Sequence, residues 1–270
     1  MKTSKFHKYA RGLWLPMPLY DSANKILIDW SAKGGSVIIA GMFFKNMGLL
    51  DEVTKYRKDW AHDYRHDIFQ GKDFDINYSD PIDYIISSDE VCRIKIVRNP
   101  FKRAVSSYTH IMKTHLQKTY NVSPSSSFVD FLQFIKNSPR VDVHWMPQKR
   151  KLEKGNKISY NFICKLEEIE KDLIKINETA KTNFDWDTSI SHNHALKNKN
   201  LSSKFQFPTV NYAEVAWDKI PLDPAPPYHY FYNKKSRSLV EEVYKSDISS
   251  YDYSYSELES DYEFNLRTCK

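Results

Sequence analysis

Residues 26–48, ILIDWSAKGGSVIIAGMFFKNMG, contain the pattern that decides the fold. The short apolar run at 26–30 predicts a buried strand, and the SAKGG segment that follows it predicts a loop. Residues 36–48 predict a buried helix, with Ser36 as its N-cap and Gly48 as its stop. A strand that leads through a glycine pair into a helix can bring backbone N–H groups close to a bound anion.

Strands and helices alternate along the rest of the chain. Further strands are predicted at 93–97 and 160–165, and further helices at 51–70, 100–117, 127–137, 166–177 and 234–247. This alternation indicates parallel β–α–β units with helices on both faces of the sheet. We therefore expect an α/β, P-loop-NTPase-like three-layer fold in which a central parallel sheet is flanked by helices. We also expect a single domain over residues 1–270, with its core at about 24–253 and a C-terminal tail at about 254–270.

Composition narrows the classes of function. The chain has 270 residues, of which 40 are Lys or Arg and 34 are Asp or Glu, so its formal net charge of +6 favours anionic ligands. Cys92, Cys164 and Cys269 lack the CxxC spacing of a zinc site, and their odd number and wide spacing favour a reducing compartment. The sequence contains neither an 18-residue apolar run nor a convincing signal peptide. We therefore expect a cytoplasmic protein without a transmembrane segment.

The first candidate phosphate site is Lys33-Gly34-Gly35-Ser36, between the first predicted strand and its helix. Glycines let the backbone approach an anion, and the helix N-terminus offers unpaired N–H groups and the positive end of the dipole. Lys33 can place its ammonium on a phosphate, and the Ser36 hydroxyl can donate to a phosphate oxygen. The segment is not a Walker A motif, because its lysine precedes the glycines.

The second candidate site is RNPFKRAVSSY at 98–108, where Arg98 directly follows a predicted strand and Pro100 suits the first position of a helix. An arginine can bind a phosphate with two parallel hydrogen bonds, and Ser106 can add a hydroxyl donor. Basic residues at a helix N-terminus are unfavourable without an anion, since the dipole there is positive. The clustering of Lys102 and Arg103 with Arg98 therefore favours phosphate binding.

The two segments together resemble those of sulfotransferases that use 3′-phosphoadenosine-5′-phosphosulfate (PAPS), and most strongly the carbohydrate-type and bacterial members. RNPFKRAVSSY resembles their 3′-phosphate segment, and SAKGGS at 31–36 resembles their 5′-phosphosulfate loop. HWMPQ at 144–148 resembles an H-W-x-P-Q segment of carbohydrate sulfotransferases. FICKLEEIEKDL at 162–173 and VYKSDISSYDY at 243–253 resemble segments that follow it. In the loop, Ala32 replaces the usual proline and Val37 replaces a frequent hydroxyl residue.

The resemblance implies specific roles for these residues. Lys33 would hold the phosphosulfate and stabilise the leaving phosphate, while Gly34, Gly35 and Ser36, with Val37 beside them, would bind the 5′-phosphate. Arg98 and Ser106 would bind the 3′-phosphate. PAPS would be the donor and PAP, the 3′,5′-bisphosphate, the product. No metal is expected.

The catalytic base is expected between the two phosphate segments, where His62 and His66 lie in AHDYRHDIF. Histidine suits proton removal near neutral pH, and a spacing of four places both on one face of a helix. A solvated polar helix explains each histidine equally well. His144 is the next candidate and is more consistent with the acceptor side, where Trp145 could also contact substrate.

Two alternatives stay open at this stage. A P-loop kinase or another nucleotide-binding enzyme would need an acidic magnesium ligand, for which Asp29 is the residue at hand. A polyanion-binding module without catalysis would bind in a steeply salt-dependent way. No nucleic acid is expected as a partner. The acceptor is a glycan or another hydroxyl compound, with a carbohydrate favoured by the H-W-x-P-Q resemblance, and the sequence leaves the oligomeric state open.

Overall fold

A computed structural model describes residues 14–56, 60–138, 142–186, 210–221 and 225–258 of the chain. The backbone divides into two compact units. Unit 1 comprises the described residues of Met1–Val97 and Gln148–Ser191, and unit 2 comprises those of Arg98–Pro147 and His192–Lys270. The expectation of one domain over the whole chain stays a prediction, and each unit is described by itself.

Unit 1 is built on a four-stranded sheet with the order β1-β2-β3-β4. The strands are β1 (Leu19–Asp21), β2 (Ile26–Asp29), β3 (Cys92–Val97) and β4 (Phe162–Lys165). β2, β3 and β4 run parallel, as the sequence predicts, and Ile28 pairs with Ile94 while Ile94 pairs with Phe162. β1 adds an antiparallel edge that the sequence did not indicate. All four residues of β2 are buried, as is usual for a strand covered on both faces.

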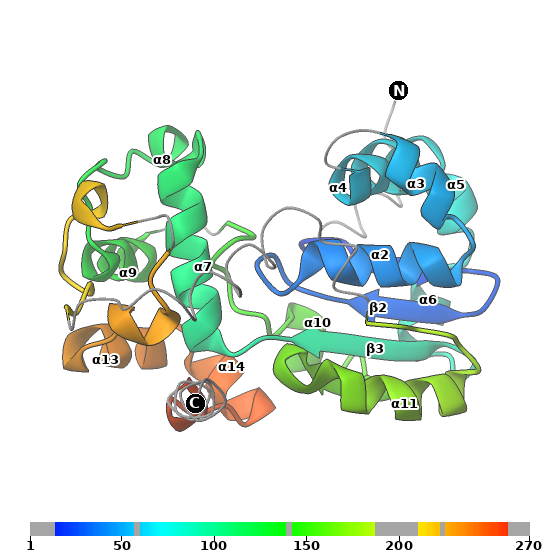
Figure 1. The fold of residues 1–270 in the computed structure, drawn as a ribbon. Coiled ribbons are helices and arrows are strands. Elements are labelled where there is room, and N and C mark those ends of the chain that lie inside the picture. The colour runs from blue at the N-terminus through cyan, green and yellow to red at the C-terminus, as the bar shows by residue number, and fades with distance from the viewer. Residues whose placement is uncertain (1–13, 57–59, 139–141, 187–209, 222–224, 259–270) are drawn as a thin grey trace, which may run out of the picture. The chain divides into compact units, whose positions relative to one another are not determined.

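Helices α2 (Ser36–Asn46) and α11 (Ile169–Ala180) lie on opposite sides of this sheet (Figure 1). The described part of unit 1 is thus a three-layer α/β unit, which confirms the predicted fold class. Phe43 and Phe44 of α2 are buried in its core. Gly48 has a φ of 73° and follows the C-cap of α2, which confirms it as the stop signal.

The segment between α2 and β3 departs from the prediction of one helix over 51–70. Short elements replace that helix, and eight residues of the segment form a π-helix, η1 (Arg65–Lys72). Gly71 lies in η1, and a Cβ there would come within 2.5 Å of the carbonyl oxygen of His66, so the wide turn needs a glycine. The other short elements of unit 1 are α3 (Leu50–Tyr56), α4 (Trp60–Tyr64), α5 (Phe74–Asn77), α6 (Ile82–Ser87), α10 (Lys151–Lys154) and η2 (Leu166–Glu168).

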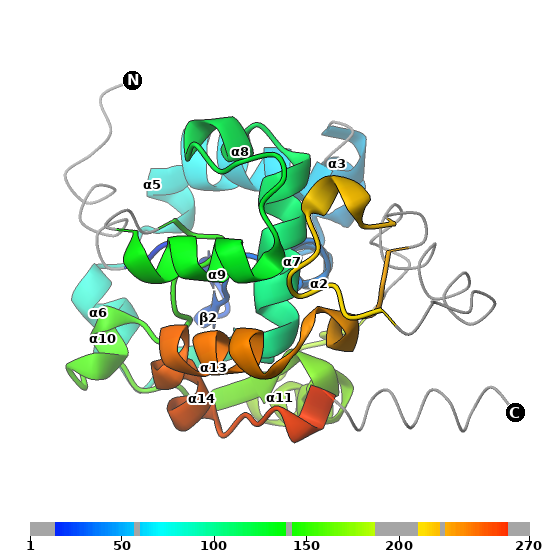
Figure 2. The ribbon, with the colours of Figure 1, turned by 90° about the vertical axis from the view of Figure 1, so that its left-hand side faces the viewer.

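Unit 2 is helical in its described residues (Figure 2). Asn99 caps α7 by accepting from the N–H groups of Phe101 and Lys102, and Pro100 stands at the first helical position as predicted. Ser127 caps α9 and forms a capping box with Asp130. The elements are α7 (Pro100–Lys113), α8 (Leu116–Thr119), α9 (Phe128–Asn137), η4 (Trp217–Lys219), η5 (Tyr228–Phe231), α13 (Lys234–Val243) and α14 (Lys245–Tyr251).

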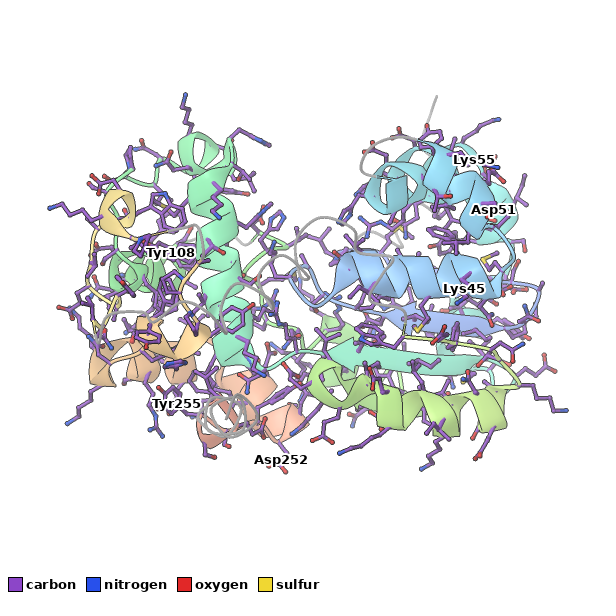
Figure 3. The ribbon with its side chains drawn as sticks, in the orientation of Figure 1. Lys45, Asp51, Lys55, Tyr108, Asp252 and Tyr255 are labelled. Carbon is purple, nitrogen blue, oxygen red and sulfur yellow. The ribbon has the colours of Figure 1, made fainter. Side chains whose placement is uncertain are left out.

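Tyr108 shows how these helices pack. Its side chain projects from α7 toward α9 (Figure 3), where its ring lies 5.5 Å from that of Phe128 and 5.6 Å from that of Phe131. Trp217 packs edge-on against the same ring at 5.3 Å. An aromatic cluster of this kind forms the core of unit 2 and fixes α7, which carries the second candidate phosphate segment.

Candidate functional site

The loop after β2 has a tight backbone with two residues in left-handed conformations. Lys33 and Gly35 adopt left-handed conformations, with φ angles of 65° and 86°. The N–H of Gly34 donates to the carbonyl of Ser31 at 2.9 Å, and a Cβ on Gly34 would lie 2.8 Å from that oxygen. A Cβ on Gly35 would lie 2.9 Å from Cδ1 of Leu166. A side chain at Gly34 would clash with backbone, and one at Gly35 would be strained at its positive φ, so the glycine pair favours this tight loop.

The N-terminus of α2 is open to an anion. Gly35, and not Ser36, is the N-cap residue, so the predicted cap was wrong by one position and Ser36 is the first helical residue. No side chain caps this end, and the first turn contains no acidic residue. The first N–H groups of a helix then lack intrahelical partners and carry its positive partial charge. Lys33, Gly34, Gly35, Ser36 and Val37 are therefore contiguous at an N-terminus suited to a phosphate.

His62 lies at this loop, and His66 lies four residues further along the chain. Nε2 of His62 is 3.3 Å from Oγ of Ser36. Nη2 of Arg65 is 3.4 Å from Nδ1 of His62 and 2.8 Å from Nε2 of His66. Arg65 is buried and its guanidinium stacks 4.5 Å from the ring centre of Trp30. The structure thus brings both predicted histidines together, through an arginine that the sequence analysis overlooked.

Arg65 constrains where the protons of these histidines lie. A guanidinium can only donate hydrogen bonds and stays protonated in proteins. Each imidazole nitrogen that faces it must therefore be an acceptor. Neutral His62 then carries its proton on Nε2 and donates to Ser36, and neutral His66 carries its proton on Nδ1.

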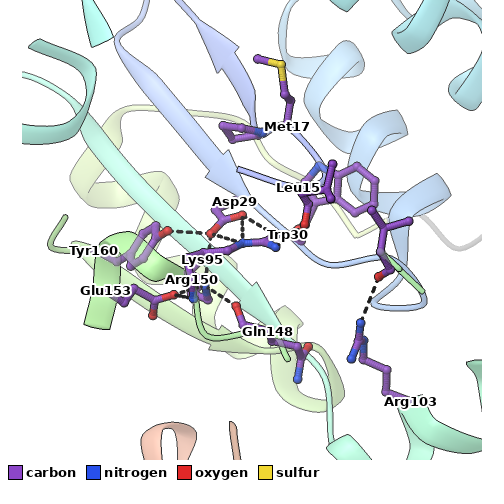
Figure 4. Close-up of polar contacts among 12 residues, drawn as sticks. Leu15, Met17, Asp29, Trp30, Lys95, Arg103, Gln148, Arg150, Glu153 and Tyr160 are labelled. Atoms are coloured by element: carbon purple, nitrogen blue, oxygen red, sulfur yellow. Dashed lines mark hydrogen bonds and ion pairs between the residues drawn. The ribbon is translucent and has the colours of Figure 1, made fainter. Parts of the chain in front are cut away.

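A buried ionic network fixes the end of β2 just before the loop (Figure 4). The Asp29 carboxylate, 0 % exposed, accepts from Nη2 of Arg150 at 2.9 Å, Nζ of Lys95 at 3.1 Å and the Tyr160 hydroxyl at 2.6 Å. Lys95 also donates to Glu153 at 2.5 Å. Arg150 reaches beyond Asp29 to the carbonyl of Trp30. The network thereby holds Asp29 and Trp30, which lead into the loop at 31–36.

The charges in this network stabilise one another. Burial opposes ionisation of Asp29, but the charges of Arg150 and Lys95 outweigh it and lower its pKa to about 2. For Arg150, burial opposes the charged form and Asp29 more than compensates, so its pKa is raised. Both oxygens of Asp29 are already engaged by cationic or hydroxyl donors, which is not the setting of a magnesium ligand.

In unit 2, Arg98 directly precedes Asn99, the N-cap of α7, and Ser106 lies within α7; both side chains are partly exposed. Nη2 of Arg98 donates to the hydroxyl of Tyr228 at 2.9 Å, a contact between segments too distant in sequence to be predicted. Arg103 does not join them, because it is fully buried and Nη2 donates to the carbonyl of Val143 at 3.3 Å (Figure 4). The basic cluster expected at 98–103 is therefore divided, and Arg103 has a structural role.

The two ring-bearing residues of the H-W-x-P-Q segment, His144 and Trp145, differ in how exposed they are. Trp145 is 3 % exposed and packs against Tyr120 at 4.7 Å, so it belongs to the core of unit 2. Its role in substrate binding stays a prediction. His144 is partly exposed, and its Nδ1 lies 2.6 Å from Oδ1 of Asp142.

The sequence matches the family model described as the sulfotransferase family over residues 43–254. The chain belongs to the sulfotransferase family. It is thus an enzyme that transfers sulfuryl groups. The match spans most of the chain and includes the segment at 98–108, but it begins inside α2, so the loop at 31–36 lies outside it.

Two further comparisons add no relatives, since neither the curated proteins nor the solved structures contain a match to this chain. Among the described residues, no helix is long and apolar enough to cross a membrane.

Proposed function

We propose that this sulfotransferase moves a sulfuryl group from PAPS to a hydroxyl or amine of an acceptor, and that the acceptor is a carbohydrate. The observation that carries the donor assignment is the loop at 31–36, which presents a lysine and an uncapped helix N-terminus directly after a parallel strand. The carbohydrate assignment rests on the H-W-x-P-Q segment at 144–148.

The donor is bound by two sets of residues in this proposal. Gly34, Gly35, Ser36 and Val37 bind the 5′-phosphate through the N-terminus of α2, and Lys33 places its ammonium on the phosphosulfate. In unit 2, Arg98 and Ser106 bind the 3′-phosphate. Arg98 suits this role because Tyr228 engages one of its nitrogens and thereby orients a fork that matches phosphate oxygens.

The reaction is an in-line displacement at sulfur, for which positioning and electrostatic stabilisation supply most of the rate. Charge grows on the bridging oxygen as it becomes part of the leaving 5′-phosphate. Lys33 stabilises that charge. His62 and His66 are the sequence-based candidates for the base, and the contact of His62 with Ser36 supports His62 as the member that lies at the loop. His144 and Trp145 are the candidates on the acceptor side.

Nucleotide binding tests the donor assignment directly. Isothermal titration calorimetry with PAP, AMP, ATP and GTP should show that PAP binds much more tightly than AMP, because only PAP has a 3′-phosphate for Arg98 and Ser106. PAPS should stabilise the fold in a thermal-shift assay as PAP does, since a ligand that binds only the native state raises apparent stability. Equal affinities for PAP and AMP, or tighter binding of ATP, would overturn the assignment.

A second candidate function is not favoured by any contact. A P-loop kinase would require an acidic magnesium ligand near the loop, and Asp29 is committed to Arg150, Lys95 and Tyr160 instead.

A further inference from the structure

The partly exposed face of α7 leads from Ser106 to a pair of imidazoles in contact. Lys102, Ser106 and His110 are each partly exposed and follow one another at a spacing of four, so they share one face of the helix. The ring of His110 lies against that of His144, with centroids 4.5 Å apart and an interplanar angle of 34°. His110 is one turn beyond Ser106, which is about 6 Å along the helix axis.

Several contacts in unit 2 hold His144 in one orientation. Asp142 Oδ1 lies 2.6 Å from its Nδ1 and also accepts from its backbone N–H at 2.9 Å. The hydroxyl of Tyr120 donates to the other carboxylate oxygen, Oδ2 of Asp142, at 2.5 Å. The hydroxyl of Ser107 on α7 donates to the carbonyl of His144. A turn at residues 142–144 would need only the hydrogen bond from the backbone N–H of His144 to Asp142. The hydrogen bond between the Asp142 carboxylate and the His144 ring is not needed to form the turn.

These contacts fix the proton on one ring nitrogen. Burial opposes ionisation of Asp142, but hydrogen bonds from His144 and Tyr120 outweigh it and lower its pKa to about 2. The carboxylate is therefore ionised at neutral pH and can only accept, so Nδ1 of His144 carries a proton.

The other nitrogen of neutral His144, Nε2, then has its lone pair available. Among the described residues, no side chain or backbone group forms a hydrogen bond with Nε2 of His144. The His144 side chain is 23 % exposed, so a small group can reach this nitrogen. A histidine whose Nδ1 donates to a partly buried carboxylate, and whose Nε2 has no partner among the described residues, is oriented to take a proton from a hydroxyl.

His62 and His66 are arranged differently. Each offers one nitrogen as an acceptor to Arg65, and neutral His62 directs the N–H of its other nitrogen at Ser36. Arg65 would also disfavour a second positive charge on either ring, which a base acquires when it takes a proton. The geometry of His144, whose Nδ1 donates to a carboxylate while Nε2 is left as an acceptor, is the more suitable one.

We infer that His144, oriented by Asp142, is the general base that deprotonates the acceptor hydroxyl. This inference rests on the proposed function and deepens it. The acceptor O–H transfers its proton to Nε2 of His144, and the oxygen uses its electron pair to form a bond to sulfur. The bond between sulfur and the bridging oxygen of PAPS breaks, and its electron pair stays on the 5′-phosphate. The products are a sulfate ester, PAP and an imidazolium that returns its proton to water.

The test uses the full chain and compares His144→Gln with His115→Gln. His115 is an exposed histidine at the N-terminus of α8 in the same unit, and no role is assigned to it. Turnover of PAPS is measured with mono- and oligosaccharides that carry glucose, galactose, N-acetylglucosamine or uronic acid, and PAP affinity is measured by calorimetry. We expect His144→Gln to lower kcat by about 10²-fold or more, with PAP affinity within threefold of wild type. His115→Gln should match the wild type.

The pH dependence separates a base from a merely structural residue. A general base must be unprotonated to act, so the wild-type pH–rate profile should contain an acidic limb that is absent from His144→Gln. The titratable groups against His144 are Asp142, with Tyr120 behind it, and His110. Asp142→Asn provides a second variant, because an amide can turn its NH₂ toward the ring and favour the wrong tautomer. It should lower kcat about tenfold or more with PAP affinity intact.

The outcomes distinguish this inference from the proposed function. If PAP binds and His144→Gln keeps wild-type kcat, while His62→Gln or His66→Gln loses it, the base is in unit 1 and only the present inference is overturned. If the wild type binds PAP no more tightly than AMP, the donor assignment fails and this inference fails with it. If His144→Gln loses PAP affinity in proportion to kcat, its role is structural and the inference is refuted.

Discussion

Replacing Asp29 by Asn should destabilise unit 1, because Asp29 is the shared counter-charge of two buried cations. Lys95 and Arg150 are 1 % and 2 % exposed. A shift of its pKa from 3.8 to about 2 corresponds to about 2 kcal/mol of stability at neutral pH. Asparagine would also turn an NH₂ donor toward the donors of Arg150 or Lys95, which costs about 1 kcal/mol more. We expect a loss of about 3 kcal/mol in the free energy of unfolding.

Thermal and urea unfolding followed by circular dichroism would measure this loss. For a chain of this size, about 3 kcal/mol corresponds to a fall in Tm of about 6–12 °C. Asp185→Asn is the matched control, since Asp185 forms an exposed ion pair with Lys45 at 2.9 Å and is 63 % exposed. Such a surface pair contributes little, so the control should stay within about 0.5 kcal/mol of wild type.

The difference between wild type and Asp29→Asn should also depend on pH with a definite sign. The folded-state pKa of Asp29 is depressed, so its stabilisation is fully present above about pH 4 and is lost as the pH falls toward 2. The two proteins should therefore converge in stability between pH 4 and pH 2. The explanation is refuted if Asp29→Asn loses no more than Asp185→Asn, or if the difference stays constant down to pH 2.

Four other expectations concern the donor site. Lys33→Ala should lower kcat by about 10²-fold or more while PAP affinity falls less. Lys25→Ala is its control, since Lys25 lies at the other end of β2 with a similar φ of 55°. Equal kcat in both variants would contradict the role of Lys33. Arg98→Ala should weaken PAP by about 2–4 kcal/mol in calorimetry without affecting AMP, and Arg98→Lys should recover only part of this. Gly35→Ala should weaken PAP and AMP alike, because its Cβ would meet Leu166 at a φ of 86°; unchanged affinities would argue against the loop as the 5′-phosphate site. Turnover of PAPS should survive EDTA, and recovery of a lost activity by magnesium would favour a kinase-type mechanism instead.

Local signals explain why much of the fold could be predicted from the sequence. β2 is buried throughout and β3 is buried at five of its six residues, so their apolar residues are a local signal of strands inside a sheet, whereas Ile163 of the edge strand β4 is exposed. Pro100 acts within the first turn of its helix, and its position was predicted correctly. The antiparallel strand β1 was not predicted, because three residues are too few for a periodic pattern.

The site was predictable only where neighbouring residues form it. Lys33, Gly34 and Gly35 are contiguous, and their conformation follows from the glycines. The partners of the site come from distant segments, as in the contact of Arg98 with Tyr228, which joins residues 130 positions apart.

Arg65 and Asp142 were recognisable in principle. Arg65 lies between His62 and His66, close enough in a helical segment to contact both, and Asp142 lies two residues before His144. Neither spacing indicates a function without the burial that the structure adds. The inward turn of Arg103 shows the opposite case, in which a charged residue at a promising position belongs to the core.

The charge balance of the buried network has a consequence for the phosphate loop. Asp29 and Glu153 are negative while Lys95 and Arg150 are positive, so the network is neutral as a set. Burial and the nearby charge of Asp29 raise the pKa of Tyr160, which keeps its hydroxyl neutral. The network therefore fixes the end of β2 without adding net charge beside the loop. In the proposed donor site, positive charge near the 5′-phosphate in unit 1 then comes from Lys33 and the N-terminus of α2, with the buried Arg65 behind His62. Lys33 acts on charge that develops during the transfer of the sulfuryl group. Its loss should therefore affect turnover more than binding.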